Sequence, residues 1–186
     1  MMYKIFVIGF NKTGTRSLYN YFKDNKIPSI HWHKGRLARV MKKNFNKGKL
    51  LMKGYDEYRV YTDMEYYPRQ NYAHITFFKE MEQQYPTAKF ILNIRDVENW
   101  IKSRNNHDNY TRDICKILKM TKKEVNEKWR KDYKEHIEKV ISYFSDKPNK
   151  LLVFDIEKDS IDKLNLFFSD LSLNSKFYKH HGKTKT

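Results

Sequence analysis

The chain has 186 residues, 39% of them hydrophobic and 16% aromatic, so we predict a single packed domain over residues 1–186 and exclude a disordered chain. Lys and Arg number 38 against 22 Asp and Glu, a formal net charge of +16 that favours an anionic ligand without naming it. No apolar run reaches the ~20 residues of a membrane span, no secretory signal is evident, and the one cysteine, Cys115, cannot form an internal disulfide, so we expect a cytoplasmic protein.

Short apolar runs alternate with amphipathic helical patterns along the whole chain. The run at 3–9 is continuously apolar at its centre, as in a strand buried on both faces of a parallel sheet. At 126–144, apolar side chains recur at helical spacing, which predicts a long packed helix. In chain order, we predict a strand at 3–9, a helix at 15–26, a strand at 27–32, a helix at 35–46, a strand at 58–63, a helix at 74–85, a strand at 88–95, a helix at 97–106, the helix at 126–144, a strand at 151–156 and a helix at 160–171.

This alternation predicts an α/β domain of three layers, in which a central, mainly parallel sheet carries helices on both faces. In such sheets, ligands bind at the carboxyl ends of the strands. The segments that follow Gly9, Asp63 and Arg95 are therefore where we expect the chemistry.

The loop after the first strand has the composition of an anion site. It runs from Gly9 through Gly14 into the helix at 15–26, and such a turn exposes consecutive backbone N–H groups at a helix N-terminus. Lys12 adds a positive charge. The loop is nearly the P-loop of nucleotide triphosphatases, but Thr15 stands where that motif requires lysine. Further hydroxyl donors are Thr13, Thr15 and Ser17.

A second candidate anion site follows the strand at 88–95. Arg95 ends this strand, and Ser103 lies nearly two turns into the next helix. Asn99 and Ser103 share one face of that helix, which leaves Trp100 and Ile101 to pack inward. The arginine fork and the hydroxyl together predict a phosphate site.

The two sites together resemble the paired signature of the sulfotransferases that use 3′-phosphoadenosine 5′-phosphosulfate (PAPS). The resemblance covers roughly residues 4–156, extends to a small bacterial-type group, and implies a P-loop-like fold with PAPS as co-substrate. It further implies that the loop binds the 5′-phosphosulfate, while the arginine and the serine bind the 3′-phosphate. The implied donor-binding residues are Lys12, Thr13, Gly14, Thr15, Arg16, Ser17, Arg95 and Ser103.

Two features depart from that family. Val97 replaces the proline that often follows the Arg-Asp pair. The glycine-rich C-terminal segment that helps to hold the 3′-phosphate is not evident, and 180–183 is only a faint substitute for it. We predict that 179–186 is a frayed tail.

Lys12 is the expected catalytic cation, because its charge would stabilise the leaving phosphate. An acceptor hydroxyl also needs a general base. Asp63, at the end of the strand at 58–63, is one candidate, and the resemblance places it near the family's catalytic His or carboxylate. His33 is the other candidate, with His31 as its rival on the same sheet edge. We expect no metal, because the His-x-His pair has no third ligand at a suitable spacing.

The remaining histidines, His74, His107 and His136, are predicted to lie on helix surfaces, and Cys115 is predicted to pack. The overall expectation is a sulfotransferase acting on a small-molecule or glycan hydroxyl (or amine), with neither nucleic acid nor a membrane span involved. Two alternatives remain: a P-loop kinase or nucleotidase with Asp63 or Asp155 holding a metal, and a basic nucleic-acid-binding protein. The acceptor and the oligomeric state stay open.

Overall fold

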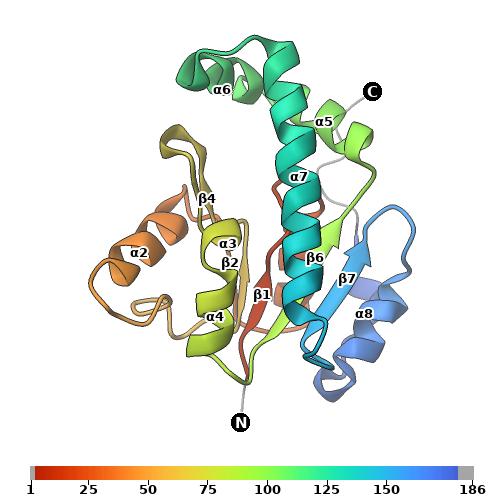
Figure 1. Cartoon of the computed structure of the whole chain (residues 1–186). Helices are drawn as coiled ribbons and strands as arrows, with labels where there is room; N and C mark the ends of the chain where they lie inside the picture. The colour runs from red at the N-terminus through yellow and green to blue at the C-terminus, as the bar shows by residue number, and fades with distance from the viewer. Residues whose placement is uncertain (1–2, 180–186) are drawn as a thin grey trace.

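A five-stranded parallel sheet forms the centre of the computed structural model, which describes residues 3–179. The strand order is β2-β3-β1-β6-β7 (Figure 1). All five predicted strands are present with somewhat shorter bounds, and the predicted three-layer α/β class is confirmed. The strands are β1 (Ile5–Val7), β2 (Ser29–His31), β3 (Val60–Thr62), β6 (Lys89–Ile94) and β7 (Leu151–Asp155).

Helices cover both faces of this sheet. Because successive side chains of a strand point to opposite faces, Phe6 of β1 enters one apolar cluster while Ile5 and Val7 enter another. Both clusters are fully enclosed, which explains the continuous apolar run that marked this strand in the sequence. The first face is covered by α2 (Arg36–Phe45), α4 (Phe78–Gln84) and α7 (Lys122–Phe144), and the second by α1 (Thr15–Asp24) and α8 (Ile161–Phe167).

Helix α7 begins four residues before its predicted start and reaches beyond the sheet (Figure 1). A capping box explains the early start, since Thr121 accepts a hydrogen bond from the Glu124 amide and Glu124 accepts one from the Thr121 amide. Past the carboxyl edge of the sheet, α7 contacts α5 (Val97–Asn105) and α6 (Tyr110–Leu118). A third apolar cluster fills this junction, and it contains Phe10, Trp100, Ile101, Tyr110, Ile114, Val125, Trp129 and Tyr133.

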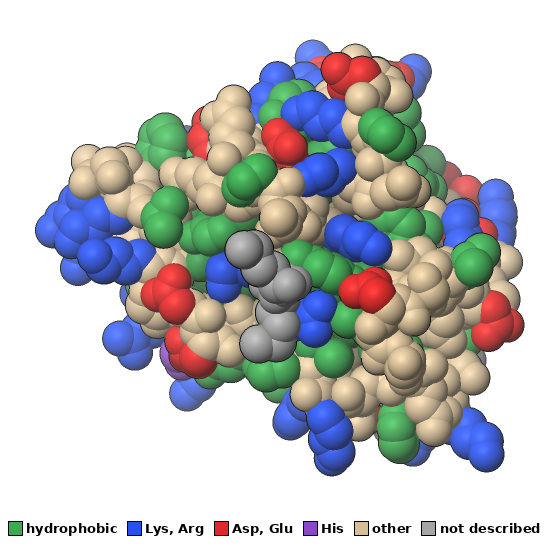
Figure 2. Space-filling model, turned by 90° about the horizontal axis from the view of Figure 1, so that it is seen from below, with side chains coloured by type: hydrophobic (Ala, Val, Ile, Leu, Met, Phe, Trp, Pro, Cys, Tyr) green, Lys and Arg blue, Asp and Glu red, His purple; other side chains and the backbone are tan. Residues whose placement is uncertain are grey.

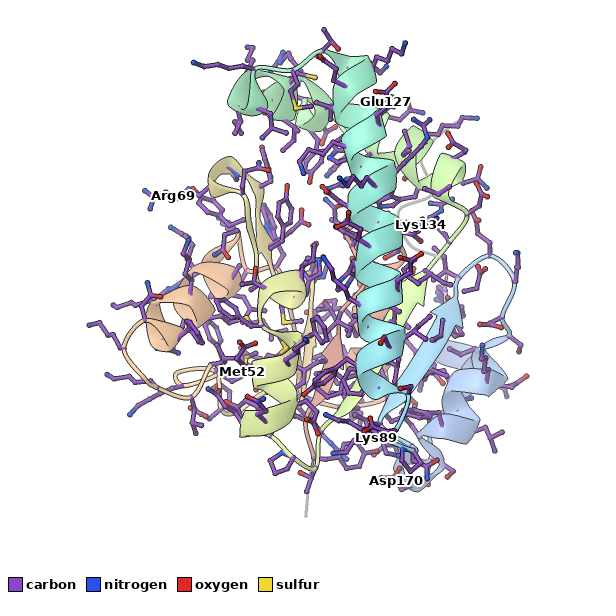
Figure 3. All side chains as sticks on the ribbon, viewed as in Figure 1. Met52, Arg69, Lys89, Glu127, Lys134 and Asp170 are labelled. Atoms are coloured by element: carbon purple, nitrogen blue, oxygen red, sulfur yellow. The ribbon has the colours of Figure 1, made fainter. Side chains whose placement is uncertain are left out.

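A small hairpin after β3 has no counterpart among the predicted elements. Its strands, β4 (Glu65–Tyr66) and β5 (Asn71–Tyr72), pair antiparallel around the 3₁₀ turn η1 (Tyr67–Arg69). Strands of two residues leave no alternating pattern to detect. The hairpin projects beyond the sheet, and Arg69 points outward from its tip (Figure 3).

Three further differences concern helices. The predicted helix at 74–85 is interrupted at Phe77, which separates α3 (Ala73–Thr76) from α4 and packs its ring against Phe45 at 4.8 Å. Helix α6 was not predicted. The last predicted helix ends at Phe167 and is followed by the 3₁₀ turns η2 (Ser169–Leu171) and η3 (Ser175–Phe177). The tail segment 180–183, considered above for the 3′-phosphate, lies outside the described residues.

His74 and His136 are buried, so their predicted surface position is wrong. The exposed fractions of the two side chains are 0% and 2%. His74 Nδ1 lies 3.3 Å from the Met64 carbonyl oxygen, and His136 Nε2 lies 2.7 Å from that of Ile8. Burial lowers the pKa of His136 to about 4 and that of His74 to about 3, which keeps both rings neutral at pH 7. His136 thus ties α7 to the residue that follows β1, and His74 ties α3 to the segment that follows β3.

The positive charge is spread over the surface. On the face shown in Figure 2, Lys and Arg side chains lie around the whole outline, with Asp and Glu side chains among them. Ion pairs are common; Lys89 and Asp170, for instance, lie 3.7 Å apart below the sheet (Figure 3). No helix within residues 3–179 combines the length and apolarity needed to cross a membrane.

Candidate functional site

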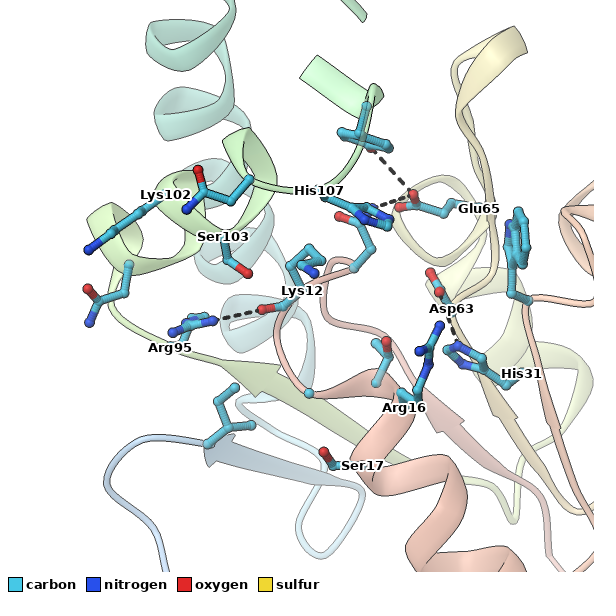
Figure 4. Close-up of a pocket in the computed structure, with 18 of the residues that line it drawn as sticks. Lys12, Arg16, Ser17, His31, Asp63, Glu65, Arg95, Lys102, Ser103 and His107 are labelled. Atoms are coloured by element: carbon cyan, nitrogen blue, oxygen red, sulfur yellow. Dashed lines mark hydrogen bonds and ion pairs between the residues drawn. The ribbon is translucent and has the colours of Figure 1, made fainter. Parts of the chain in front are cut away.

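A cavity of about 1040 Å³ lies at the carboxyl ends of the strands, the edge where the sequence analysis placed the chemistry (Figure 4). Its walls come from the loop after β1 and from the segments after β2, β3, β6 and β7. Of the ten predicted site residues, eight line it: Lys12, Gly14, Thr15, Arg16, Ser17, Asp63, Arg95 and Ser103. Thr13 and His33 are the two that do not.

The loop after β1 is tied to the neighbouring strand by Asn93, which the sequence analysis missed. The Gly9 amide donates to Asn93 Oδ1 at 2.9 Å, and Asn93 Nδ2 donates to the Thr13 carbonyl at 2.8 Å and to the Thr13 hydroxyl at 2.6 Å. A Cβ atom on Gly9 would lie 2.1 Å from the Asn93 carbonyl oxygen, so only glycine fits this approach. Thr13 is fully buried, and the hydrogen bonds that its carbonyl and hydroxyl accept from Asn93 fix the shape of the loop.

Two residues in the left-handed region of backbone conformation shape the turn of this loop. Lys12 has φ 65° and Gly14 has φ 83°. Gly14 is the N-cap of α1 and brings no side chain to cap the first turn, whose N-terminus faces the cavity wall that Gly14 and Thr15 line. Burial, followed by repulsion from Arg16 and then Arg95, lowers the pKa of Lys12 from its ordinary value. Three cations thus surround one short loop, an arrangement suited to a polyanion.

Glu157 pairs with Arg95 by accepting two of its hydrogen bonds. The sequence had not indicated a role for this glutamate. Arg95 Nε donates to Glu157 Oε1 at 3.1 Å, its Nη2 donates to the same oxygen, and its Nη1 donates to the Lys12 carbonyl at 3.2 Å. The Asp96 amide and Asn99 Nδ2 also donate to this carboxylate, at 3.0 Å and 3.3 Å. Glu157 therefore lies where an anion bound by Arg95 would lie.

The helix after β6 has the orientation that the sequence predicts. Trp100 and Ile101 are buried, Asn99 is exposed, and Ser103 lines the cavity. Figure 4 shows Ser103 and Lys102 on the same side of the cavity as Arg95, with Lys12 between them and the opposite wall. Arg95 and Ser103 are thus brought together beside the loop.

Asp63 and His31 form the opposite wall. Asp63 Oδ2 lies 3.5 Å from His31 Nε2, and His31 Nδ1 lies 2.8 Å from the Thr62 hydroxyl. Burial lowers the pKa of His31 to about 4, so its ring is neutral. Burial raises the pKa of Asp63 against the opposing effect of nearby cations, of which Arg16 is the strongest. Asp63 Oδ1 is buried and has no hydrogen-bond partner within residues 3–179.

His33 is directed elsewhere. It belongs to a run of four left-handed residues, 32–35, and its Nδ1 lies 2.9 Å from the Tyr55 hydroxyl. The structure therefore brings Asp63, but not His33, together with Lys12. His107, predicted to lie on a helix surface, instead follows the end of α5 and lines the cavity.

Two buried residues of ionisable type, Glu65 and Arg104, lie at or next to the cavity. Neither was predicted from the sequence. Glu65 in β4 is 3% exposed and accepts a hydrogen bond from Asn11 Nδ2 at 2.8 Å. Arg104 is 1% exposed and donates to the Tyr110 hydroxyl. Its guanidinium lies 4.3–5.7 Å from four ring centroids, those of Phe10, Trp100, Tyr110 and Trp129.

One signal in the sequence could have located Arg104. It stands four residues after Trp100 in a helix whose inward face carries that tryptophan, so helical spacing alone places it inside. Glu65 offered no such signal, because it belongs to the undetected hairpin. Among residues 3–179 there is no group of three or more His, Cys, Asp or Glu arranged to hold a metal.

Comparison with known proteins agrees with this arrangement. The model of a family described as a sulfotransferase domain matches residues 4–120, which is more than half of the chain. The matched region contains the loop after β1, Asp63, Arg95 and Ser103, whereas Glu157 and the whole of α7 lie beyond it. No curated protein matches the chain. The resemblance inferred from the loop and the Arg95–Ser103 pair is thereby confirmed at the level of the family: the chain belongs to the sulfotransferase domain family.

Proposed function

We propose that the protein transfers the sulfuryl group of PAPS to an acceptor hydroxyl. One observation carries this proposal: a single cavity joins two cationic anion-binding elements to a carboxylate on the opposite wall. The first element is the loop around Lys12 at the N-terminus of α1, and the second is Arg95 with Ser103. PAPS carries two anionic groups, a 5′-phosphosulfate and a 3′-phosphate, and each element suits one of them.

In this assignment the loop binds the reacting end of the donor. The first-turn amides of α1 and the charges of Lys12 and Arg16 hold the phosphosulfate. Thr13 contributes its backbone, because its side chain is engaged with Asn93. Arg95 and Ser103 hold the 3′-phosphate, which lies away from the reacting sulfur.

The transfer is an in-line displacement. The acceptor oxygen forms a bond to sulfur while the bond from sulfur to the bridging oxygen breaks, and the electron pair of that bond stays on the phosphate of the nucleotide. Lys12 neutralises the charge that develops on this phosphate. The acceptor proton passes to Asp63, whose Oδ1 is free to take it. The product nucleotide is adenosine 3′,5′-bisphosphate (PAP).

PAP should bind without added metal and raise the melting temperature. A ligand that binds only the folded protein stabilises it by RT ln(1 + [L]/Kd), or about 2.7 kcal/mol at a hundredfold excess over Kd. Differential scanning fluorimetry in EDTA checks this, with AMP as the control that lacks the 3′-phosphate. Folded protein that shows no shift at saturating PAP would refute the donor assignment.

Glu157→Gln should tighten PAP binding about three- to tenfold. In the wild type the 3′-phosphate must displace a carboxylate that accepts hydrogen bonds from Arg95, Asn99 and the Asp96 amide. The amide removes one negative charge from this place. Isothermal titration calorimetry measures the effect, with Glu127→Gln on the exposed face of α7 as the matched control. Weaker binding by Glu157→Gln would instead mean that Glu157 orients Arg95 in the bound state.

A further inference from the structure

Glu65 is a buried carboxyl group with one oxygen free to meet a ligand. Its Oε1 accepts hydrogen bonds from Asn11 Nδ2 at 2.8 Å and from the Tyr110 hydroxyl at 3.4 Å. Its Oε2 has no partner within residues 3–179, although the side chain is only 3% exposed and lines the cavity. A buried polar atom without a partner is costly, and when its residue lies in the wall of a cavity, a ligand in that cavity can supply the partner.

The free oxygen of Glu65 lies on the same wall as the free oxygen of Asp63. The two residues are separated by one position, and the Glu65 amide donates to the Asp63 carbonyl at 2.9 Å. Figure 4 shows both carboxyl groups on the side of the cavity opposite Arg95 and Ser103. A ligand that places one group at Asp63 is therefore well placed to bring a second group to Glu65.

The charges around Glu65 indicate what kind of group this is. Arg104, in its cage of rings, lies behind Tyr110 and supplies a buried positive charge on that side. Lys12 and Arg16 supply two more on the donor side of the cavity. These three cations outnumber the two carboxyl groups, those of Asp63 and Glu65, so a positively charged ligand would gain little binding energy here. A neutral hydroxyl satisfies the free oxygen without adding charge.

We propose that Glu65 binds a second hydroxyl of the acceptor, adjacent to the hydroxyl that attacks sulfur, so that the acceptors are compounds with two neighbouring hydroxyl groups. This inference rests on the proposed function, because it takes Asp63 as the residue that meets the first hydroxyl. Trp32, Tyr67 and Tyr110 also line the cavity, and their faces suit the carbon skeleton of a ring that carries such a pair.

The test compares trans-cyclohexane-1,2-diol with cyclohexanol as acceptors for PAPS. The wild type should prefer the diol about tenfold in kcat/KM after correction for its two equivalent hydroxyls, the usual effect of one hydrogen bond to a buried group. Glu65→Ala should reduce this ratio to about 1. Glu65→Gln should retain it within about threefold, because the amide can donate to the same hydroxyl oxygen. Glu82→Ala, which removes a half-buried glutamate on α4, is the matched control and should leave the ratio unchanged.

Each other outcome has a fixed meaning. An equal diol preference in wild type and Glu65→Ala overturns the inference. Transfer to neither alcohol by a protein that binds PAP overturns it as well and leaves the donor assignment standing, whereas failure to bind PAP refutes the proposed function itself. Should Glu65→Ala not fold, Glu65→Asp replaces it. The shorter acid keeps the carboxyl group but withdraws the free oxygen, so an unchanged ratio in that variant also overturns the inference.

Discussion

Lys12→Ala should lower kcat for sulfuryl transfer by about 10²–10³-fold while weakening PAP affinity much less. The lysine charge lies in the loop that we propose receives the phosphosulfate, and its effect is greatest when negative charge develops on the leaving phosphate. An interaction that strengthens in the transition state appears in kcat rather than in ground-state binding. Steady-state kinetics at saturating PAPS, with PAP titrations on the same protein, measure both quantities.

Arg95→Ala is the informative contrast to this variant. It should weaken PAP binding at least about tenfold and leave kcat at saturating PAPS within a few-fold of the wild type, because the 3′-phosphate lies away from the reacting sulfur. Lys134→Ala, an exposed lysine on α7, controls for the change in net charge (Figure 3). If Lys12→Ala and Arg95→Ala both lost only affinity, and to the same degree, the division into two anion sites would be wrong.

Asp63→Asn should lower turnover by about 10²–10⁴-fold with PAP binding retained, the usual range for a positioned acid–base group. Asn preserves the size of the side chain and also tolerates the left-handed backbone at this position, where φ is 55°. His33→Ala should stay within about threefold of the wild type, because its ring contacts Tyr55 and does not line the cavity. The reverse result, near-normal Asp63→Asn and inactive His33→Ala, would assign the base to His33.

The pH dependence gives an independent reading of the same residue. Burial raises the pKa of Asp63, and only the ionised form can accept the acceptor proton. The wild-type kcat/KM should therefore fall as the pH is lowered through this raised pKa, above the ordinary range of an aspartate. Asp63→Asn should lack that acidic limb in its residual activity. Insoluble Asp63→Asn protein would instead indicate a carboxylate that serves to hold the turn after β3.

Much of the fold could be predicted because its signals are local. The apolar runs of β1 and β6, the spacing in α7 and the turn at Gly9 each depend on a few consecutive residues. The same holds for the loop around Lys12, whose anion-binding character follows from its composition and from the helix that comes after it. Arg95 and Ser103 could be paired because both follow one strand, within two turns of helix.

What could not be predicted depends on contacts between distant segments. Glu157 lies 62 positions after Arg95, and Asn93 lies 80 after Thr13, so no spacing rule connects either pair. Glu65 depends on a hairpin of two-residue strands, which leaves no periodic pattern. The position of His33 likewise needed the structure, because Asp63 and His33 both follow strands that end at the same sheet edge, and only the backbone after β2 turns His33 toward Tyr55.

The sequence by itself thus determined the α/β class and the family and predicted the two anion-binding elements, because each is encoded by neighbouring residues or by the order of the elements. Only the tertiary structure decided how the elements converge on one cavity and which acids stand there with a free oxygen. Burial and the field of nearby charges decide the chemistry of a carboxyl group, and both arise from packing between segments such as β4, α5 and α6. For that reason nothing in the sequence around Glu65 marks it out, and the burial of Glu65 and Arg104 becomes evident only in the folded protein.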